Sequence, residues 1–78
     1  MDAVKFEGMN AVYGGPGFGN LPAKHTTDEA TGRDAVVSVW KPSAEDLEIL
    51  NNGGCVCLDI LGGQPPVAMW TEKVNIID

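Results

Sequence analysis

The alternation of apolar and polar residues is most regular between residues 38 and 67. It predicts the end of a strand, a capped helix and then a hairpin. Residues 34–40 (DAVVSVW) are rich in β-branched side chains at consecutive positions, which is typical of a strand covered on both faces. We therefore predict a strand over residues 34–40 with both faces buried, ended by Lys41 and Pro42.

Residues 43–54 (SAEDLEILNNGG) carry signals for both ends of a helix. Ser43 is a good N-cap, and Asp46 three residues later approximates a capping box. Glu45 and Asp46 also lie where the positive end of the helix dipole favours acidic side chains. Two asparagines and two glycines follow Leu50, and glycine supplies the left-handed conformation that ends many helices. The pattern predicts a helix over about Ser43–Asn51.

Residues 55–61 (CVCLDIL) alternate, so that Val56, Leu58 and Ile60 share one face of a predicted strand. Residues 62–66 (GGQPP) predict a turn. Residues 67–71 then return as the second strand of an antiparallel hairpin, and residues 74–77 (VNII) predict a further extended piece.

The first 33 residues are less regular. Residues 4–7 (VKFE) alternate like a short strand, whereas the glycines of residues 8–20 predict a long loop. Residues 21–26 are again extended, and Pro22 indicates a strand start or a sheet edge. Residues 27–33 (TDEATGR) predict a turn.

These elements predict an α+β fold, with a mainly antiparallel sheet of four to five strands and one short helix. We expect one small domain, residues 1–78, with a glycine-rich loop over about 8–20 and a regular core over about 34–78. A chain of 78 residues buries only about 60–65% of its unfolded surface, so its stability needs support.

Self-association is the support that the composition favours. Cys55 and Cys57 are two apart in a predicted strand, about 6.5–7 Å along the chain, at or beyond the reach of an unstrained disulfide. The chain has two cysteines and one histidine, fewer ligands than a structural zinc site needs. We therefore expect a homo-oligomer, with no metal and no cofactor.

The net charge of −6 argues against duplex nucleic acid or an anionic membrane as a partner, because the five basic residues are dispersed. The sequence has no apolar run of 18 residues and no signal-peptide pattern. We expect a protein of the cytoplasm, where unpaired thiols stay reduced.

The glycine-rich stretch and the lone histidine are the first candidates for chemistry. The loop is either a surface turn or a loop that closes over a ligand, with Tyr13 or Phe18 stacking on it. His25, beside Lys24, is an exposed hydrogen-bonding residue, a ligand contact or a general base oriented by a carboxylate. No nucleophile follows it at a known spacing, so we do not expect an enzyme.

The two tryptophans are either core and interface anchors or flat stacking surfaces. Arg33 and Lys41 flank the strand that contains Trp40, a combination suited to a phosphorylated ring compound. The predicted ligand-binding residues are Tyr13, Phe18, Lys24, His25, Arg33, Trp40, Lys41 and Trp70.

The last 40 residues or so contain W-x-P-[ST] at residues 40–43, then L-x-x-G-G at 50–54 and G-x-x-P-P-V at 62–67. This pattern resembles a set of small proteins encoded by tailed bacteriophages and prophages. The resemblance implies a fold and a phage setting; it brings no active site.

Short accessory phage proteins often work by occupying a target in the host, and the resemblance therefore implies a non-enzymatic binding protein in the host cytoplasm. The first hypothesis is counter-defence, with a small anionic ligand such as a host signalling nucleotide sequestered at a subunit interface. The alternatives are a protein–protein inhibitor of a host nuclease or immune effector, and a structural or assembly component of the virion.

Overall fold

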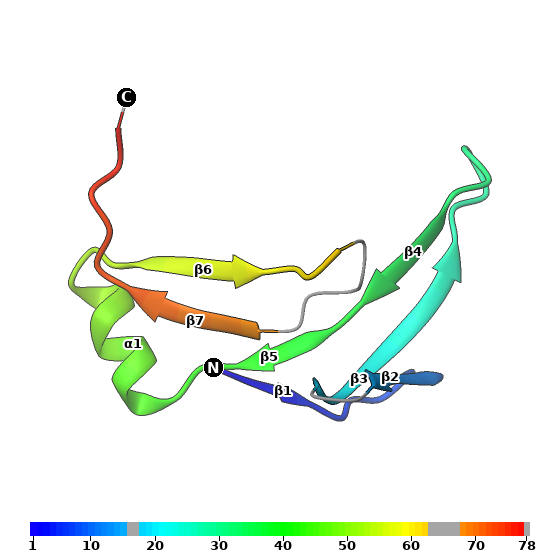
Figure 1. Cartoon of the computed structure of the whole chain (residues 1–78), viewed down its shortest axis with the longest axis horizontal. Helices are drawn as coiled ribbons and strands as arrows, with labels where there is room; N and C mark the ends of the chain where they lie inside the picture. Colours follow the sequence, from blue (N-terminus) through cyan, green and yellow to red (C-terminus); the bar gives the residue numbers. More distant parts are fainter. Residues whose placement is uncertain (16–17, 63–67, 78) are drawn as a thin grey trace. The chain divides into compact units, whose positions relative to one another are not determined.

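Short strands in three small sheets, with one helix, make up the described part of the chain (Figure 1). The structure is a computed structural model, and it describes residues 1–15, 18–62 and 68–77. The elements in chain order are β1 (Asp2–Val4), β2 (Ala11–Gly15), β3 (Phe18–Thr27), β4 (Asp34–Val37), β5 (Val39–Lys41), α1 (Ala44–Asn51), β6 (Cys55–Asp59) and β7 (Ala68–Glu72).

The predicted α+β class, with mainly antiparallel strands and a single short helix, is confirmed. Within the described residues the strands form sheets in the orders β1-β5, β2-β3-β4 and β6-β7, rather than one sheet of four or five strands. The chain divides into two compact units. Unit 1 comprises Met1–Asp2 and Lys41–Asp78, and unit 2 comprises Ala3–Trp40. The single domain expected from the sequence stays a prediction.

The glycine-rich segment is not a long loop, and that prediction is wrong for the residues described. Ala11–Gly15 forms β2, which pairs antiparallel with β3, and β3 already begins at Phe18. Glycine accepts extended backbone as readily as a turn, and here Gly14 lies where the register shifts between Tyr13 and Gly15. Residues 16 and 17 lie outside the described part.

The buried apolar side chains in the described residues come from residues 21–23 in the middle of β3. The extended structure predicted there is confirmed. Strand β2 pairs with residues 18–23 of β3, whereas β4 pairs with residues 24–27. Pro22 therefore lies outside the stretch that β4 pairs with, where β3 needs no backbone donor toward β4.

Residues 34–40 are a broken and exposed segment, so the prediction of one strand buried on both faces is wrong. The extended chain stops at Ser38 between β4 and β5, and Ser38 accepts a hydrogen bond from Nε1 of Trp40 at 2.9 Å. All four residues of β4 are exposed. A run of β-branched residues favours extended backbone, but it does not provide the layers that would cover it.

The turn before β4 is confirmed. Its backbone is closed by hydrogen bonds from Asp28 N to Arg33 O and from Gly32 N to Asp28 O, both 2.7 Å. The side chain of Asp28 accepts further bonds from Ala30 N and the Thr31 hydroxyl.

Helix α1 begins with the capping box that the sequence predicts. The Ser43 hydroxyl accepts a hydrogen bond from Asp46 N at 3.0 Å, and Asp46 Oδ2 accepts one from Ser43 N at 2.8 Å. Two backbone donors that the helix leaves unpaired are thus satisfied within four residues.

We expect the Ser43→Ala variant to lose about 1 kcal/mol of stability, because alanine cannot accept the bond from Asp46 N. Thermal unfolding followed by circular dichroism measures the loss, as a decrease in Tm of about 4–8 °C. The neighbouring Ala44→Ser substitution is the control, and it should shift Tm by less than half as much. Equal shifts in the two variants would contradict a capping role.

The C-terminal end of α1 is a Schellman motif, as the asparagines and glycines indicate. Gly54 N donates to Ile49 O at 2.8 Å, and Gly53 N donates to Leu50 O at 3.1 Å. Gly53 has φ 87°, in the left-handed region. These bonds satisfy helix carbonyls and direct the chain into β6.

Strands β6 and β7 form the predicted antiparallel hairpin. Val56 lies opposite Thr71, Cys57 opposite Trp70 and Leu58 opposite Met69. The turn predicted at residues 62–66 lies outside the described residues from 63 onward. The first strand is Asp2–Val4 rather than residues 4–7, so that prediction is wrong. Residues 74–77 belong to no strand, and the extended piece expected there stays a prediction.

Candidate protein-binding surface

The β6–β7 hairpin presents one face made almost entirely of apolar side chains. Directly opposite residues of an antiparallel pair point to the same side, and each strand alternates. Val56, Leu58, Met69 and Thr71 therefore share one face, which we call the Val56 face. The other face carries Cys55, Cys57, Asp59, Ala68, Trp70 and Glu72.

Helix α1 is held at the Thr71 end of the Val56 face by a buried carboxylate. Asp46 Oδ1 accepts a hydrogen bond from the Thr71 hydroxyl at 2.6 Å. Oδ2 of the same side chain accepts bonds from the Ser43 N–H and hydroxyl and lies 2.9 Å from the amino group of Met1. Asp46 is 7% exposed and Thr71 8% exposed. Asp46, the acidic residue of the capping box, thus also anchors the helix on the hairpin.

These donors lower the pKa of the Asp46 carboxyl far below its ordinary value. The hydrogen bond from Thr71 is the largest cause, followed by the Ser43 backbone N–H and the amino group, and all three favour the ionised form. Burial works in the opposite direction, and the Ser43 hydroxyl adds a smaller favourable bond. The carboxylate is therefore charged throughout the physiological range of pH.

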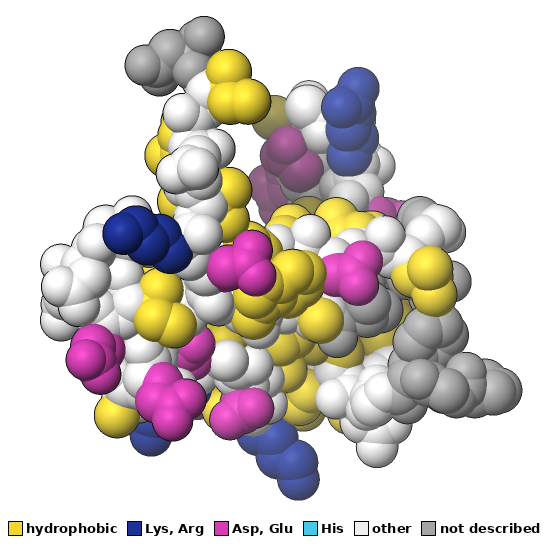
Figure 2. Space-filling model, turned by 60° about the vertical axis from the view of Figure 1, so that its left-hand side comes forward, with side chains coloured by type: hydrophobic (Ala, Val, Ile, Leu, Met, Phe, Trp, Pro, Cys, Tyr) yellow, Lys and Arg dark blue, Asp and Glu magenta, His cyan; other side chains and the backbone are white. Residues whose placement is uncertain are grey.

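The rest of the Val56 face is only partly covered, and Met69 on it is half-buried. Val56 is 47% exposed and Leu58 is 51% exposed, although the face carries no charged side chain in the described residues. Figure 2 shows apolar side chains reaching the surface beside acidic ones. The other large apolar side chains with exposed surface are Val12, Val36, Val37, Val39, Leu47, Ile60, Leu61, Trp70, Val74, Ile76 and Ile77.

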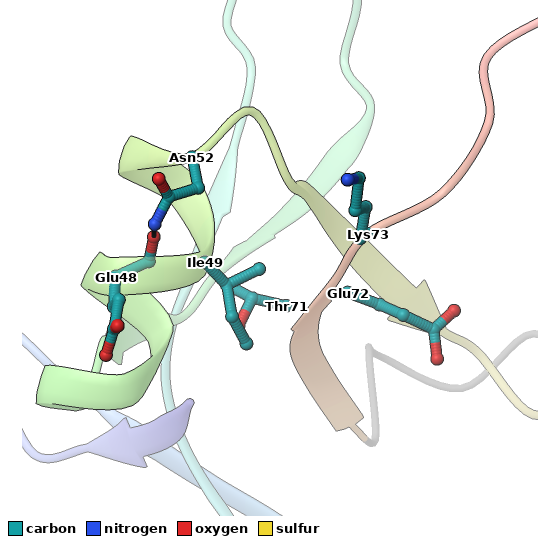
Figure 3. A pocket seen from close by; sticks show the side chains of 6 residues that line it. All are labelled: Glu48, Ile49, Asn52, Thr71, Glu72 and Lys73. Carbon is teal, nitrogen blue, oxygen red and sulfur yellow. Dashed lines mark hydrogen bonds between the residues drawn. The ribbon is translucent and has the colours of Figure 1, made fainter.

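A shallow hollow of about 420 Å³ lies where α1 meets the end of β7 (Figure 3). Glu48 and Ile49 of α1 and the C-cap residue Asn52 line one side, and residues 71–73 line the other. Asn52 is tied to the helix, since its side-chain amide donates to Glu48 O at 2.8 Å. With Glu48, Glu72 and Lys73, the hollow has two carboxylates and one ammonium group, which does not suit an anionic ligand.

The described residues that line this hollow include none of the predicted ligand-binding residues. In unit 2, Tyr13 is half-buried in β2, Phe18 is the first residue of β3, and Arg33 is exposed in the turn before β4. Lys24 and His25 are adjacent in β3 and therefore point to opposite faces of the sheet. The described backbone thus does not gather these two side chains on one surface.

The remaining three predicted residues belong to two strands. Trp40 and Lys41 are in β5, where Trp40 is half-buried and Lys41 exposed. Trp70 in β7 is 40% exposed and lies opposite Cys57. Trp70 is thus the predicted residue that belongs to the hairpin, on the face opposite the Val56 face. The role of all eight in binding a ligand stays a prediction.

His25 takes part in a small polar cluster on the surface of unit 2. Its Nε2 lies 3.7 Å from Asp34 Oδ1, which also accepts a hydrogen bond from the Thr27 hydroxyl at 3.1 Å. The side-chain amide of Asn10 donates a hydrogen bond to His25 O and accepts one from His25 N. Since the two ionisable side chains are 45% and 70% exposed, their pairing contributes at most about 1 kcal/mol.

Comparison with protein-family models, with curated proteins and with solved structures gives no match for this chain. Within residues 1–15, 18–62 and 68–77, no three His, Cys, Asp or Glu side chains are placed to hold a metal ion, and both cysteines are free thiols. The helical structure described is too short and too polar to cross a bilayer.

The sequence could predict two features of this surface, the shared face of Val56 and Leu58 and the exposed apolar residues, but it could not predict the bond between Asp46 and Thr71. The alternation of residues 55–61 correctly placed Val56 and Leu58 on one face. One predicted short helix is also too small to cover a whole sheet, which is a signal for exposed apolar residues. The bond between Asp46 and Thr71 joins residues 25 apart, and no local pattern indicates it.

Proposed function

We propose that this chain is a non-enzymatic binding protein that acts by binding another protein through an exposed apolar surface. The observation that carries the proposal is the Val56 face, an apolar sheet face that α1 covers only at its Thr71 end. Exposed apolar faces of soluble proteins commonly mark sites of association.

The free energy available from this face is large enough to matter for binding. Val56 and Leu58 are each about half exposed, so full burial of the remainder contributes about 1 kcal/mol per side chain. Carboxylates on the opposite face, Asp59 and Glu72, keep the free hairpin hydrated. The Val56 face, which lacks charged side chains in the described residues, has the composition of the core of a protein interface.

A protein partner fits the described residues better than the small anionic ligand that the sequence suggested. The hollow beside α1 carries more acidic than basic groups, and Lys24 and His25 point to opposite faces of β3. The resemblance to small phage proteins suggests that the partner is a host protein in the host cytoplasm, such as a nuclease or an immune effector.

The test compares two valine variants that are matched in exposure. Val56 and Val37 are both strand residues and both 47% exposed, but Val37 belongs to β4 in unit 2. Wild-type, Val56→Ser and Val37→Ser proteins are immobilised and exposed to lysate of the bacterium that carries the gene. A retained protein is then purified and titrated calorimetrically against each variant.

We expect Val56→Ser to weaken the complex roughly tenfold and Val37→Ser to leave Kd within about twofold. Equal weakening by both variants would overturn the role of the Val56 face. Parallel titrations with cyclic oligonucleotides and ADP-ribose derivatives test the first sequence hypothesis. Heat from one of these, with no protein retained, would contradict our proposal and support the small anionic ligand. Recovery of the chain in purified virions would contradict it in favour of a virion component.

A further inference from the structure

We propose that the free edge of β6 pairs antiparallel with β6 of a second copy of this chain, about a two-fold axis at Cys57. The inference rests on the proposed function in one respect, since both use the β6–β7 hairpin as the binding element. The face and the edge of that hairpin are nevertheless different surfaces, and they can be tested separately.

Further strands would enlarge a sheet that is small in the described residues. In the described residues β6 pairs with β7 and with no other strand. A two-stranded sheet is marginal in water unless it gains further strands or packs against a helix, and here α1 packs on the hairpin at its Thr71 end. Two hairpins joined through β6 give a four-stranded sheet in the order β7-β6-β6-β7, with one continuous Val56 face.

In the part of the chain that the structure describes, no strand pairs with the edge of β6 that faces away from β7, and this edge has few of the features that prevent strand pairing. Natural edges are protected by charged residues, especially lysine, by proline or by a bulge. The sequence of β6, CVCLD, contains no lysine or proline, and its one charged residue, Asp59, is the last of the strand. Its register with β7 runs without a shift from Cys55 to Asp59. The β7 side is more occupied, because α1 is bonded to Thr71 and lies on that side of the hairpin in Figure 1.

The sequence of β6 is complementary to itself when reversed. A two-fold axis at Cys57 pairs all five residues, with Val56 opposite Leu58 of the second copy and Cys55 opposite Asp59 of the second copy. Apolar side chains thus meet apolar ones on the Val56 face. The two Asp59 carboxylates lie at opposite ends, about 13 Å apart, which exceeds the Debye length of about 8 Å at physiological salt.

This register makes a specific prediction for the two thiols. Cys57 lies directly opposite Cys57 of the second copy, with Cα atoms about 4.5–5.5 Å apart, which is within disulfide reach. The two Cys55 residues are about 13 Å apart, and they cannot be bridged. Oxidation with copper–phenanthroline should therefore give a disulfide-linked dimer in wild-type protein and in Cys55→Ser, but not in Cys57→Ser.

Charge substitutions test the same register without oxidation. Cys57→Lys places two ammonium groups opposite each other and should raise the dimer dissociation constant roughly tenfold or more. Cys55→Lys places its ammonium opposite Asp59 of the second copy, so the constant should stay the same or fall. Sedimentation equilibrium of both variants and of the wild type measures these constants, and circular dichroism verifies that each variant is folded.

Three results would overturn the β6 dimer. The first is a wild-type protein that sediments as a monomer at 100 times the concentration used for cross-linking, up to about 1 mM. The others are cross-linking that persists in Cys57→Ser and an equal rise of the dimer dissociation constant in the two lysine variants. These measurements use the purified chain alone. A cross-linked dimer that binds no host protein would therefore contradict the proposed function and leave this inference standing. A protein that binds a host protein but forms no cross-linked dimer would contradict this inference and leave the proposed function standing.

Discussion

We expect the Asp46→Asn variant to melt well below the wild-type protein at pH 7, by about 5–10 °C. The substitution keeps the shape of the side chain but removes the charge that Thr71, Ser43 and the amino group of Met1 stabilise. It weakens the helix cap and the attachment of α1 to β7 together, because one carboxylate serves both. Thermal unfolding followed by circular dichroism at pH 7 measures the change.

The pH dependence of stability separates the contribution of the Asp46 charge from that of the side-chain shape, which Asn shares. The pKa of Asp46 is lowered in the folded protein, so its contribution is fully present above the unfolded-state value of about 4 and is lost as the pH falls below it. The wild-type advantage over Asp46→Asn should therefore shrink as the pH falls from about 5 toward 2. Glu45→Gln is the matched control, since Glu45 is an exposed acid of the same helical turn. An advantage that is constant with pH would contradict this account.

We expect Gly54→Ala to be the most damaging single-methyl substitution among the glycines described. A Cβ at this position would lie 2.7 Å from the backbone oxygen of Ile49 and would also collide with Cγ2 of that side chain. The same oxygen accepts the hydrogen bond from Gly54 N that closes the Schellman motif. Relief of the overlap must move the helix end or the start of β6, at a cost of about 2–3 kcal/mol.

Chemical denaturation gives the free energy of unfolding for this comparison. Gly19→Ala is the matched control, because Gly19 lies in β3 and a Cβ there would meet nothing within 4 Å; its effect should be within about 0.5 kcal/mol of zero. Gly53→Ala should fall between the two, at about 1 kcal/mol, since φ is 87° but the space is open. A Gly54→Ala variant as stable as Gly19→Ala would show that the end of α1 is not held by this contact.

Local sequence signals predicted the second half of the chain well. The capping box between Ser43 and Asp46 involves residues three apart, and the stop at Gly53 depends on one backbone conformation. Alternation in residues 55–61 was enough to place the hairpin and its faces. Each of these features is decided by residues that are neighbours in the chain, so the sequence contains the whole cause.

The errors came where pairing partners or covering layers are distant. Glycine-rich residues 11–15 form a strand because β3 supplies their cross-strand hydrogen bonds, and composition alone favours a loop. Residues 34–37 (DAVV) form a strand with all four residues exposed, because the described chain places no layer over them. The eight predicted ligand-binding residues were chosen by chemical type, and type does not state which side chains converge.

The sequence by itself determined the helix with its two ends, the hairpin and the alternation that groups Val56 with Leu58. Only the tertiary structure decided that Asp46 anchors the helix on Thr71 and that the rest of this apolar face stays only partly covered. The physical reason is range: backbone conformation and capping are set by adjacent residues. Burial instead depends on contacts with elements that are distant in the sequence. In the described residues the one helix, of eight residues, is too small to cover the whole apolar face.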